Sequence, residues 1–309
     1  MTTTDQSGIR LGMIAPFAEG LITSGSFLRE LAGTLEECGV ESLWTVEHVV
    51  FAEDYEPLYP YSESGRTPSA AGVVPMPDPL ETIAFLAGAS TTLRFGTAMV
   101  VAPLHSPVVL AKRAATIDRQ SDGRFMLGLG IGWQKEEYAA VGAPFTDRGR
   151  RLDDCIGAMR ALWADAPATF HGTYVSFDRL HSLPRPANGS VPIILGGNSE
   201  PAVRRAGRSG DGWFPYTITP DDFAVAADAL RRSAAAAGRQ EDAVEITAWP
   251  GSCDRDREND PAFVHRYAAA GATRLVLGPP PAGELLGPGG LDRLREYVDR
   301  YRQDVLAKL

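Results

Sequence analysis

The sequence contains no apolar run close to the length that crosses a bilayer. A membrane-spanning helix needs about 20 consecutive apolar residues, and every apolar run in this chain is interrupted sooner. The N-terminal stretch MTTTDQSG is polar and lacks the apolar segment of a secretory signal. We therefore expect a soluble, cytoplasmic protein with no membrane partner.

Paired cysteines and clusters of basic residues are also missing. The three cysteines, Cys38, Cys155 and Cys253, lie far apart and form no Cys-x-x-Cys motif, so neither a zinc site nor a disulfide framework is predicted. The formal net charge is −9 and no Lys/Arg cluster stands out, which argues against nucleic acid as a partner. The five histidines form no i, i+4 pair and have no carboxylate at ligand spacing, so we expect no metal.

What the chain does contain is a regular alternation of short apolar runs and longer amphipathic runs. The apolar runs predict strands at residues 10–17, 42–48, 93–103, 124–133, 191–198, 211–216, 243–252 and 273–280. The amphipathic runs predict a helix after each strand, at residues 26–39, 78–91, 106–121, 147–164, 199–210, 220–239, 260–272 and 289–309. Strands that alternate with helices indicate a parallel sheet covered by helices.

Eight strand–helix pairs predict an α/β protein with a closed (β/α)8 TIM barrel. We expect residues 1–309 to form one domain of this kind, with insertions after the second and fourth strands. The first insertion is the Pro/Tyr/Gly/Ser-rich segment 49–77, and the second is the irregular segment 168–190. The competing interpretation is a doubly wound open sheet with fewer strands.

In a (β/α)8 barrel the active site lies at the C-terminal ends of the strands. The stretch LWTVEH ends the second predicted strand on Glu47 and His48. Histidine is the side chain most easily used as an acid or base near neutral pH, although His48 could instead be a polar residue that caps a strand. Because neighbouring residues in a strand point to opposite faces, Glu47 and His48 need not touch, and one of them alone could line the cavity.

Glycines gather at the end of the fourth predicted strand, in GLGIGW. A glycine lets a cofactor or another backbone approach closely, but these glycines could equally relieve crowding inside the barrel. The dinucleotide-binding pattern Gly-x-Gly-x-x-Gly fails because Trp133 stands at its third glycine, although Asp147 has the spacing of a ribose-binding acid.

The fifth predicted strand ends in a possible anion site, LGGNSE. Two glycines leave the strand, and Asn198 and Ser199 then offer caps to the next helix. Free backbone N–H groups at such a helix start bind phosphate, although a well-capped junction without a ligand explains the pattern as well. In the first insertion, Tyr55, Tyr59 and Tyr61 are either lid aromatics or packing anchors.

Three stretches resemble the luciferase-like flavin and deazaflavin oxidoreductases, and most of all the branch that uses coenzyme F420. They are SLWTVEH at 42–48, the block from LRFGTAMVV to KEEYAAVG at 93–142, and VPIILGGNSEPAVRRAGRSGDGWF at 191–214. The resemblance covers nearly the whole chain. It implies a (β/α)8 barrel with insertions, a homodimer, and an isoalloxazine-type ring in the pocket at the strand ends.

The resemblance also implies roles for individual residues. His48 would lie beside the ring as the acid or base. A bulge in the third strand, at Thr97, Ala98 and Met99, would support the ring through a cis Ala98–Met99 bond. The remaining cofactor-binding residues that it implies are Gly130, Ile131 and Gly132 along the cofactor, and Gly196, Gly197, Asn198 and Ser199 at its phosphate.

We therefore predict an oxidoreductase that transfers a hydride between F420 and a small organic substrate. Catalysis would involve His48 and Glu47, and Glu47 could tune His48, face the helix layer or contact the cofactor tail. Some flavin-binding members carry Arg where this chain has Ile131, which slightly favours the deazaflavin. The alternative is an FMN-dependent monooxygenase that activates O2, and the lesser alternative is a non-catalytic flavin-binding protein. Segments 49–77 and 168–190 are expected to build the substrate pocket and its lid.

Overall fold

The barrel is closed by parallel strand pairing. The computed structural model describes residues 8–67, 74–164 and 166–309. Around the barrel the strands pair in the order β1, β2, β3, β5, β8, β9, β10, β11 and back to β1. Their bounds are Arg10–Ile14 (β1), Ser42–Thr45 (β2), Arg94–Thr97 (β3), Phe125–Gly130 (β5), Ile193–Gly196 (β8), Gly212–Phe214 (β9), Glu245–Ala248 (β10) and Arg274–Leu277 (β11). This is the predicted TIM barrel, and the open-sheet alternative is excluded.

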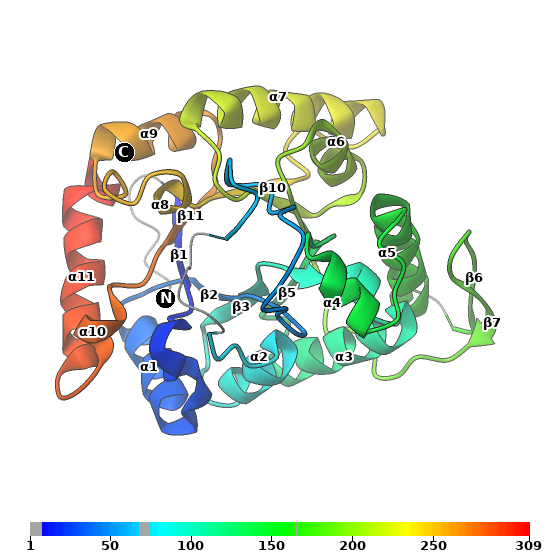
Figure 1. Ribbon diagram of the computed structural model, residues 1–309, viewed down its shortest axis with the longest axis horizontal. Helices are drawn as coiled ribbons and strands as arrows, with labels where there is room; N and C mark the ends of the chain where they lie inside the picture. The colour runs from blue at the N-terminus through cyan, green and yellow to red at the C-terminus, as the bar shows by residue number, and fades with distance from the viewer. Residues whose placement is uncertain (1–7, 68–73, 165) are drawn as a thin grey trace.

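Helices surround these strands, and Figure 1 shows them as an outer ring. Their bounds are Gly25–Glu37 (α1), Pro79–Ala87 (α2), Pro107–Gln120 (α3), Lys135–Ala140 (α4), Arg148–Ala164 (α5), Glu200–Ser209 (α6), Pro220–Ala236 (α7), Pro250–Cys253 (α8), Pro261–Ala269 (α9), Ala282–Leu285 (α10) and Gly290–Asp304 (α11). Short 3-10 turns lie at Ala18–Thr23, Ala102–Leu104 and Leu306–Lys308. Among the described residues, no helix is long and apolar enough to span a bilayer.

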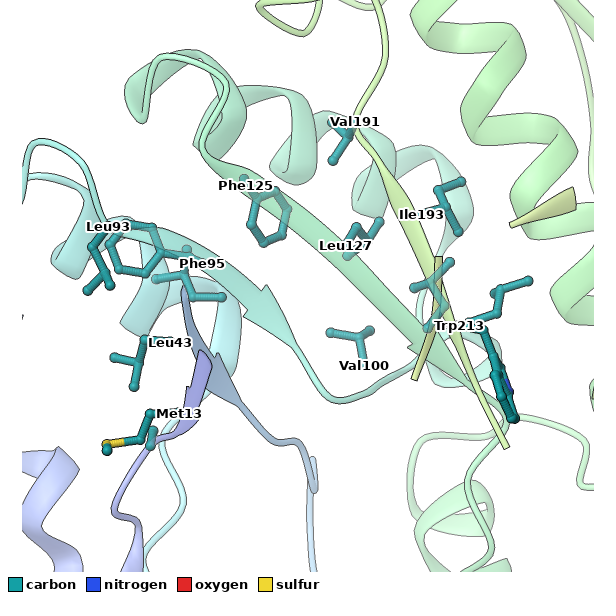
Figure 2. Close-up of a cluster of buried hydrophobic side chains, with 14 of the residues drawn as sticks. Met13, Leu43, Leu93, Phe95, Val100, Phe125, Leu127, Val191, Ile193 and Trp213 are labelled. Carbon is teal, nitrogen blue, oxygen red and sulfur yellow. The ribbon is translucent and has the colours of Figure 1, made fainter. Parts of the chain in front are cut away.

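Consecutive residues of each strand belong to two different hydrophobic clusters, because strand side chains alternate between faces. Outward side chains such as Met13, Leu43 and Leu127 join the large cluster beneath the helices, which Figure 2 shows for part of the barrel. The inner cluster consists of Ile14, Trp44, Met126, Ile194, Phe214 and Val276. A Cβ atom on Gly96 would collide with the Trp44 indole, so glycine is required in β3 for this indole to fill the interior.

The structure differs from the predicted elements in the third strand, in segment 168–190 and at the short helices, of which α8 replaces the end of the predicted strand 243–252 and α10 was not predicted. The third predicted strand is split into β3 and the two-residue strand β4, Val100–Val101, by residues 98 and 99. The short helix α4 was not predicted. Segment 168–190 contains an antiparallel hairpin of β6, Ala168–His171, and β7, Ser176–Leu180, which follows α5.

Candidate active site

A large cavity opens at the C-terminal ends of the strands. Its volume is about 1380 Å³, and its lining includes residues that follow β2, β5, β8, β9 and β10. Pockets that hold one drug-sized ligand are typically about 300–1,000 Å³. The cavity therefore has room for a cofactor and a second molecule together, at the end of the barrel where active sites of this fold lie.

His48 lies in the wall of this cavity and is held by a buried carboxylate from α4. Its Nδ1 is 3.2 Å from Oε2 of Glu137, a side chain that is 1% exposed. The other carboxylate oxygen of Glu137 accepts the backbone N–H groups of Val49 at 2.6 Å and Val50 at 3.3 Å. Because a carboxylate accepts, Nδ1 of His48 carries the hydrogen, and Nε2 is the ring nitrogen left for a ligand.

Glu47 also lines the cavity but binds different partners. Oε2 accepts the backbone N–H of Val101 at 2.6 Å, and Oε1 lies 3.0 Å from Nε2 of His105. Both residues line the cavity and they do not bond each other, so the possibility that one of them alone lines it is not realised. Strand β2 ends at Thr45, so strict alternation no longer governs residues 47 and 48. Glu47 thus ties the tip of β2 to β4, and neither His48 nor the outer helix layer is its partner.

The bulge between β3 and β4 projects Met99 into the barrel. The Ala98–Met99 peptide is cis, the geometry that the resemblance implies. A Cβ atom on Gly196 would lie 2.8 Å from Cγ of Met99, and one on Gly130 would lie 3.3 Å from its Cβ. These glycines therefore make space for the Met99 side chain, which supports the interpretation that they relieve crowding inside the barrel. Met99 and the two glycines all line the cavity and form its floor.

Thr97 is placed differently from the other predicted cofactor-binding residues. It is completely buried and is absent from the cavity lining. Its hydroxyl donates to the carbonyl oxygen of Gly128 at 2.7 Å and accepts the Gly128 N–H at 2.8 Å. Thr97 therefore joins β3 to β5 and has no free group for a ligand.

The turn after β8 presents an open helix start to the cavity. Gly197 has φ of 102°, which favours glycine. The Asn198 side chain is used within the protein, because its amide donates to the carbonyl oxygen of Tyr216 at 2.5 Å and its Oδ1 accepts the Tyr216 N–H at 3.2 Å. Ser199 precedes α6 and makes no side-chain capping bond. Its hydroxyl and the first N–H groups of α6 are thus placed to receive an anion.

Two arginines line the same region and were not predicted. Arg205 is paired with Asp153 at 2.8 Å. Arg148 has a different setting, since its guanidinium donates to the carbonyl oxygen of Gly132 at 2.8 Å and lies 3.7 Å from the centre of the Phe145 ring. Arg148 forms no ion pair within the part of the chain that the structure describes. Partial burial lowers the pKa of its guanidinium because the charged form loses solvation. An anion beside it would offset that loss.

The loop after β2 supplies the aromatic wall of the cavity. Tyr59 and Tyr61 line it, whereas Tyr55 packs behind them, with its ring centre 5.1 Å from that of Trp133. The loop tyrosines thus include both lid aromatics and a packing anchor. Residues 68–73 of this segment lie outside the described residues.

The expectation that segment 168–190 helps to build the pocket was wrong. None of the lining residues comes from it within the part of the chain that is described. Helix α5 starts beside the cavity at Arg148, but farther along Arg160 bonds Asp211, just before the start of β9. The hairpin leaves from this far end of α5, and Figure 1 shows it at the edge of the molecule.

The structure also bears on two further points from the sequence, the role of Asp147 and the possibility of a metal site. Asp147 forms an ion pair with Arg150 and does not line the cavity, which removes the ribose-binding role. Within residues 8–67, 74–164 and 166–309, no group of three or more His, Cys, Asp or Glu side chains is arranged to hold a metal ion. The cavity therefore combines a histidine with one free ring nitrogen, an anion-receiving turn with arginine, and an apolar floor.

Curated proteins share part of this sequence. The chain is 30% identical over 207 residues to an uncharacterized protein of Mycobacterium tuberculosis, covering 67% of this chain and 70% of that protein. It is 31% identical over 179 residues to the FMNH2-dependent dimethylsulfone monooxygenase of Pseudomonas putida, covering 57% of this chain and 48% of the relative.

The fold itself is shared with a solved structure. The coenzyme F420-dependent tetrahydromethanopterin reductase of Methanopyrus kandleri superposes with a TM-score of 0.71 at 16% identity, covering 96% of this chain and 98% of that chain. The sequence matches the luciferase-like monooxygenase family over residues 9–271. Members of this family are F420- or flavin-dependent oxidoreductases and monooxygenases, and this chain belongs to it.

Proposed function

We propose that the protein is an oxidoreductase that binds coenzyme F420 and exchanges a hydride with a small organic substrate. The observation that carries the proposal is that one cavity joins His48 to an anion-receiving turn. A redox cofactor with a flat ring and a phosphate-bearing tail requires both features. When bound, F420 would supply the carbon that gives or takes the hydride.

The residues present fit such a cofactor. Ala98, Met99, Gly130 and Gly196 form an apolar floor in the lining, and Met99 packs against the two glycines. A flat ring could rest on this surface. The N–H groups at the start of α6, the Ser199 hydroxyl and the Arg148 guanidinium would hold the phosphate.

His48 would move the proton that accompanies hydride transfer. Its Nδ1–H is committed to Glu137, so Nε2 is the atom that would take a proton from a substrate hydroxyl or return it. Glu47 would act by holding Val101 and thereby the bulge next to Ala98 and Met99. The surrounding apolar and aromatic lining would exclude water from the transfer.

The preference for F420 over FMN rests on Ile131. Ile131 lines the cavity between Gly130 and Gly132, where an arginine would add a second fixed charge for a flavin phosphate. An FMN-dependent monooxygenase is the second candidate. It is favoured by the 31% identity to the FMNH2-dependent enzyme of Pseudomonas putida.

Titration with four ligands tests the cofactor assignment. F420 and FMN carry a phosphate, whereas riboflavin and the riboflavin-like core of F420 lack it. We expect F420 to bind with a micromolar or lower Kd, at least about 10-fold more tightly than FMN, when fluorescence quenching is followed. Micromolar binding of FMN alone would overturn the F420 assignment, and oxygen consumption with reduced FMN would establish the monooxygenase.

Arg148→Ala tests the phosphate site in the same assay. Loss of a charge-assisted contact should weaken the binding of F420 about 10-fold and leave the binding of its phosphate-free core unchanged. Arg150→Ala is the matched control, because Arg150 lies two residues away on α5, pairs with Asp147 and does not line the cavity. Equal effects on both ligands would remove Arg148 from the phosphate site.

We further propose a homodimer. Phe85 on α2 is 41% exposed and Val109 on the adjacent α3 is 55% exposed, so an apolar surface is available there. Light scattering in solution should then give a mass near twice the 33.1 kDa of the chain, and a mass of one chain would exclude the dimer.

A further inference from the structure

The outer part of the cavity is built from aromatic side chains of four separate loops. Tyr59 and Tyr61 come from the loop after β2, Trp133 follows β5, Tyr216 follows β9 and Trp249 follows β10. We call these five residues the aromatic box. None of them is needed for the phosphate site or for the pair of His48 and Glu137.

The box is held together by its own ring contacts. The ring centre of Tyr59 lies 5.2 Å from that of Trp133 and 5.5 Å from that of Tyr61, and both pairs are edge to face. Tyr61 meets Tyr216 at 5.0 Å, and Tyr216 meets Trp249 at 5.6 Å. Edge-to-face pairs of this kind orient both rings, so the five side chains present a preformed wall of ring faces and edges to the cavity.

The box also offers hydrogen bonds from neutral groups. The Tyr59 hydroxyl is close enough to Tyr216 for that residue to affect its pKa. Burial and the neighbouring tyrosines raise the pKa of Tyr59, and burial together with Tyr216 raises that of Tyr61. These phenols therefore remain O–H donors at every physiological pH. The Trp249 indole N–H is already used, because it donates to Glu258 Oε1 at 3.0 Å.

Charged side chains lie elsewhere in the cavity. Its charged lining residues are Glu47, His48, Glu63, Arg148 and Arg205. Glu63 is exposed, and the arginines lie beside α6, where the phosphate site is proposed. An anion placed in the box would lose its hydration without gaining a cation, which is unfavourable.

We propose that the aromatic box binds the substrate, and that this substrate is a flat, uncharged ring compound with a carbonyl or hydroxyl oxygen. The rings would pack against Trp133 and Trp249, and the oxygen would be recognised by the tyrosine hydroxyls. His48 adjoins the box, since its ring centre is 5.9 Å from that of Trp133. The inference rests on the proposed function, because the box forms the part of the cavity that a bound cofactor would leave free.

Two ligands that share a ring and differ in charge test this inference. 2-Acetonaphthone is a neutral ketone and 2-naphthoate is its anionic counterpart. Isothermal titration of the whole chain should give a micromolar Kd for the ketone, at least 10-fold below that for the carboxylate. Equal or tighter binding of 2-naphthoate would overturn the proposal.

Variants locate the binding site. Tyr216→Phe keeps the ring and removes one hydroxyl, so we expect a 3-fold to 10-fold weaker affinity for the ketone. Trp249→Ala should weaken it more than 10-fold, but this variant could misfold because Trp249 packs on the inner cluster. Tyr61→Phe is therefore the second test. Tyr174→Phe, which removes a tyrosine hydroxyl outside the cavity lining, is the matched control and should leave the affinity unchanged.

The outcomes separate this inference from the cofactor assignment. FMN or F420 binding that persists in Tyr216→Phe and Tyr61→Phe, together with weaker ketone binding, supports the box. Ketone affinity that is unchanged in both variants overturns it, whatever the cofactor titrations show. Failure of FMN and F420 to bind would overturn the proposed function and leave the ketone measurements interpretable by themselves.

Discussion

The two ends of the barrel use buried titratable side chains in opposite ways. At the N-terminal end, Arg274 is completely buried and contacts Glu41 with two nitrogens, at 2.9 Å and 3.0 Å, and Glu245 at 3.3 Å. Arg10 and Arg94 complete this network. At the C-terminal end, both carboxylate oxygens of Glu47 are bonded, to the Val101 N–H and to His105, whereas His48 is bonded through Nδ1 to Glu137 and keeps Nε2 for a ligand in the cavity. Charges closed by neighbouring strands stabilise the barrel, and a ring nitrogen left open to the cavity is available for chemistry.

Removal of Arg274 should have the largest effect on stability. Arg274→Ala leaves the carboxylates of Glu41 and Glu245 without their shared cation, and breaking a buried ion pair in this way costs about 3–5 kcal/mol of unfolding free energy. Urea unfolding followed by circular dichroism measures it. Arg295→Ala is the control, because Arg295 is 38% exposed and pairs with exposed carboxylates, so about 0–1 kcal/mol is expected. A loss below about 1 kcal/mol for Arg274→Ala would mean that the network does not support the barrel.

Loss of His48 should leave stability nearly unchanged and affect turnover instead. His48→Ala removes the group that moves the proton, so turnover should fall at least about 100-fold while the Kd of the cofactor changes little. His171→Ala is the matched control, since His171 also pairs with a carboxylate, Asp178 at 3.1 Å, but lies exposed in β6. Undiminished turnover in His48→Ala, with cofactor binding intact, would exclude His48 from the mechanism.

Acid should weaken the N-terminal end of the barrel. Burial acts to raise the pKa of Glu41, but hydrogen bonds and charge from Arg274, with Ser42 and Arg94, outweigh it and lower the pKa to about 2 from its ordinary value of 4.5. A depressed carboxylate pKa contributes stability that is fully present above the unfolded-state value and is lost as pH falls toward the folded-state value. This contribution should therefore disappear between pH 4.5 and about 2.

A comparison of wild type with Glu41→Gln isolates that effect. Unfolding free energies measured in urea between pH 5 and 2 should fall more steeply for the wild type, with a difference in slope that approaches about 1.4 kcal/mol per pH unit. Parallel curves for the two proteins would show that Glu41 does not titrate in this window.

The smallest effect is expected at the residue that positions His48. Glu137→Gln keeps an oxygen for the loop N–H groups and removes the charge that faces Nδ1, so kcat should fall about 10-fold with KM and cofactor Kd unchanged. Glu136→Gln is the control, because Glu136 lies on the same helix and accepts the Glu56 N–H at 2.9 Å without contacting His48. Equal losses in both variants would assign Glu137 a structural role in the loop.

Local patterns in the sequence were sufficient to predict the barrel. Alternation of apolar and amphipathic runs is a local property, and it places each strand and helix within a few residues of its observed bounds, as β5 and α3 illustrate. The signals that mark the start of a helix are also local. Asp78 caps α2 by accepting the N–H of Leu80 at 2.8 Å and of Glu81 at 3.2 Å, as its position before Pro79 predicts. The rule that places active sites at C-terminal strand ends then selected His48 and the turn at Gly196 and Gly197 as candidates.

The partners of these residues came from closure of the barrel and could not be read from spacing. Glu137 lies 89 residues from His48, and His105 lies 58 residues from Glu47. Arg148 reaches the cavity because α5 begins beside it, and segment 168–190 misses the cavity because α5 ends at the other end of the strands. Contacts of this kind depend on which strand ends become neighbours in three dimensions. Side-chain pairs across a cavity have no regular spacing in the sequence, so spacing does not predict them. The sequence was therefore enough to identify the fold and the end of the barrel where chemistry is expected, whereas the pairing of each acid with its histidine required the closed structure.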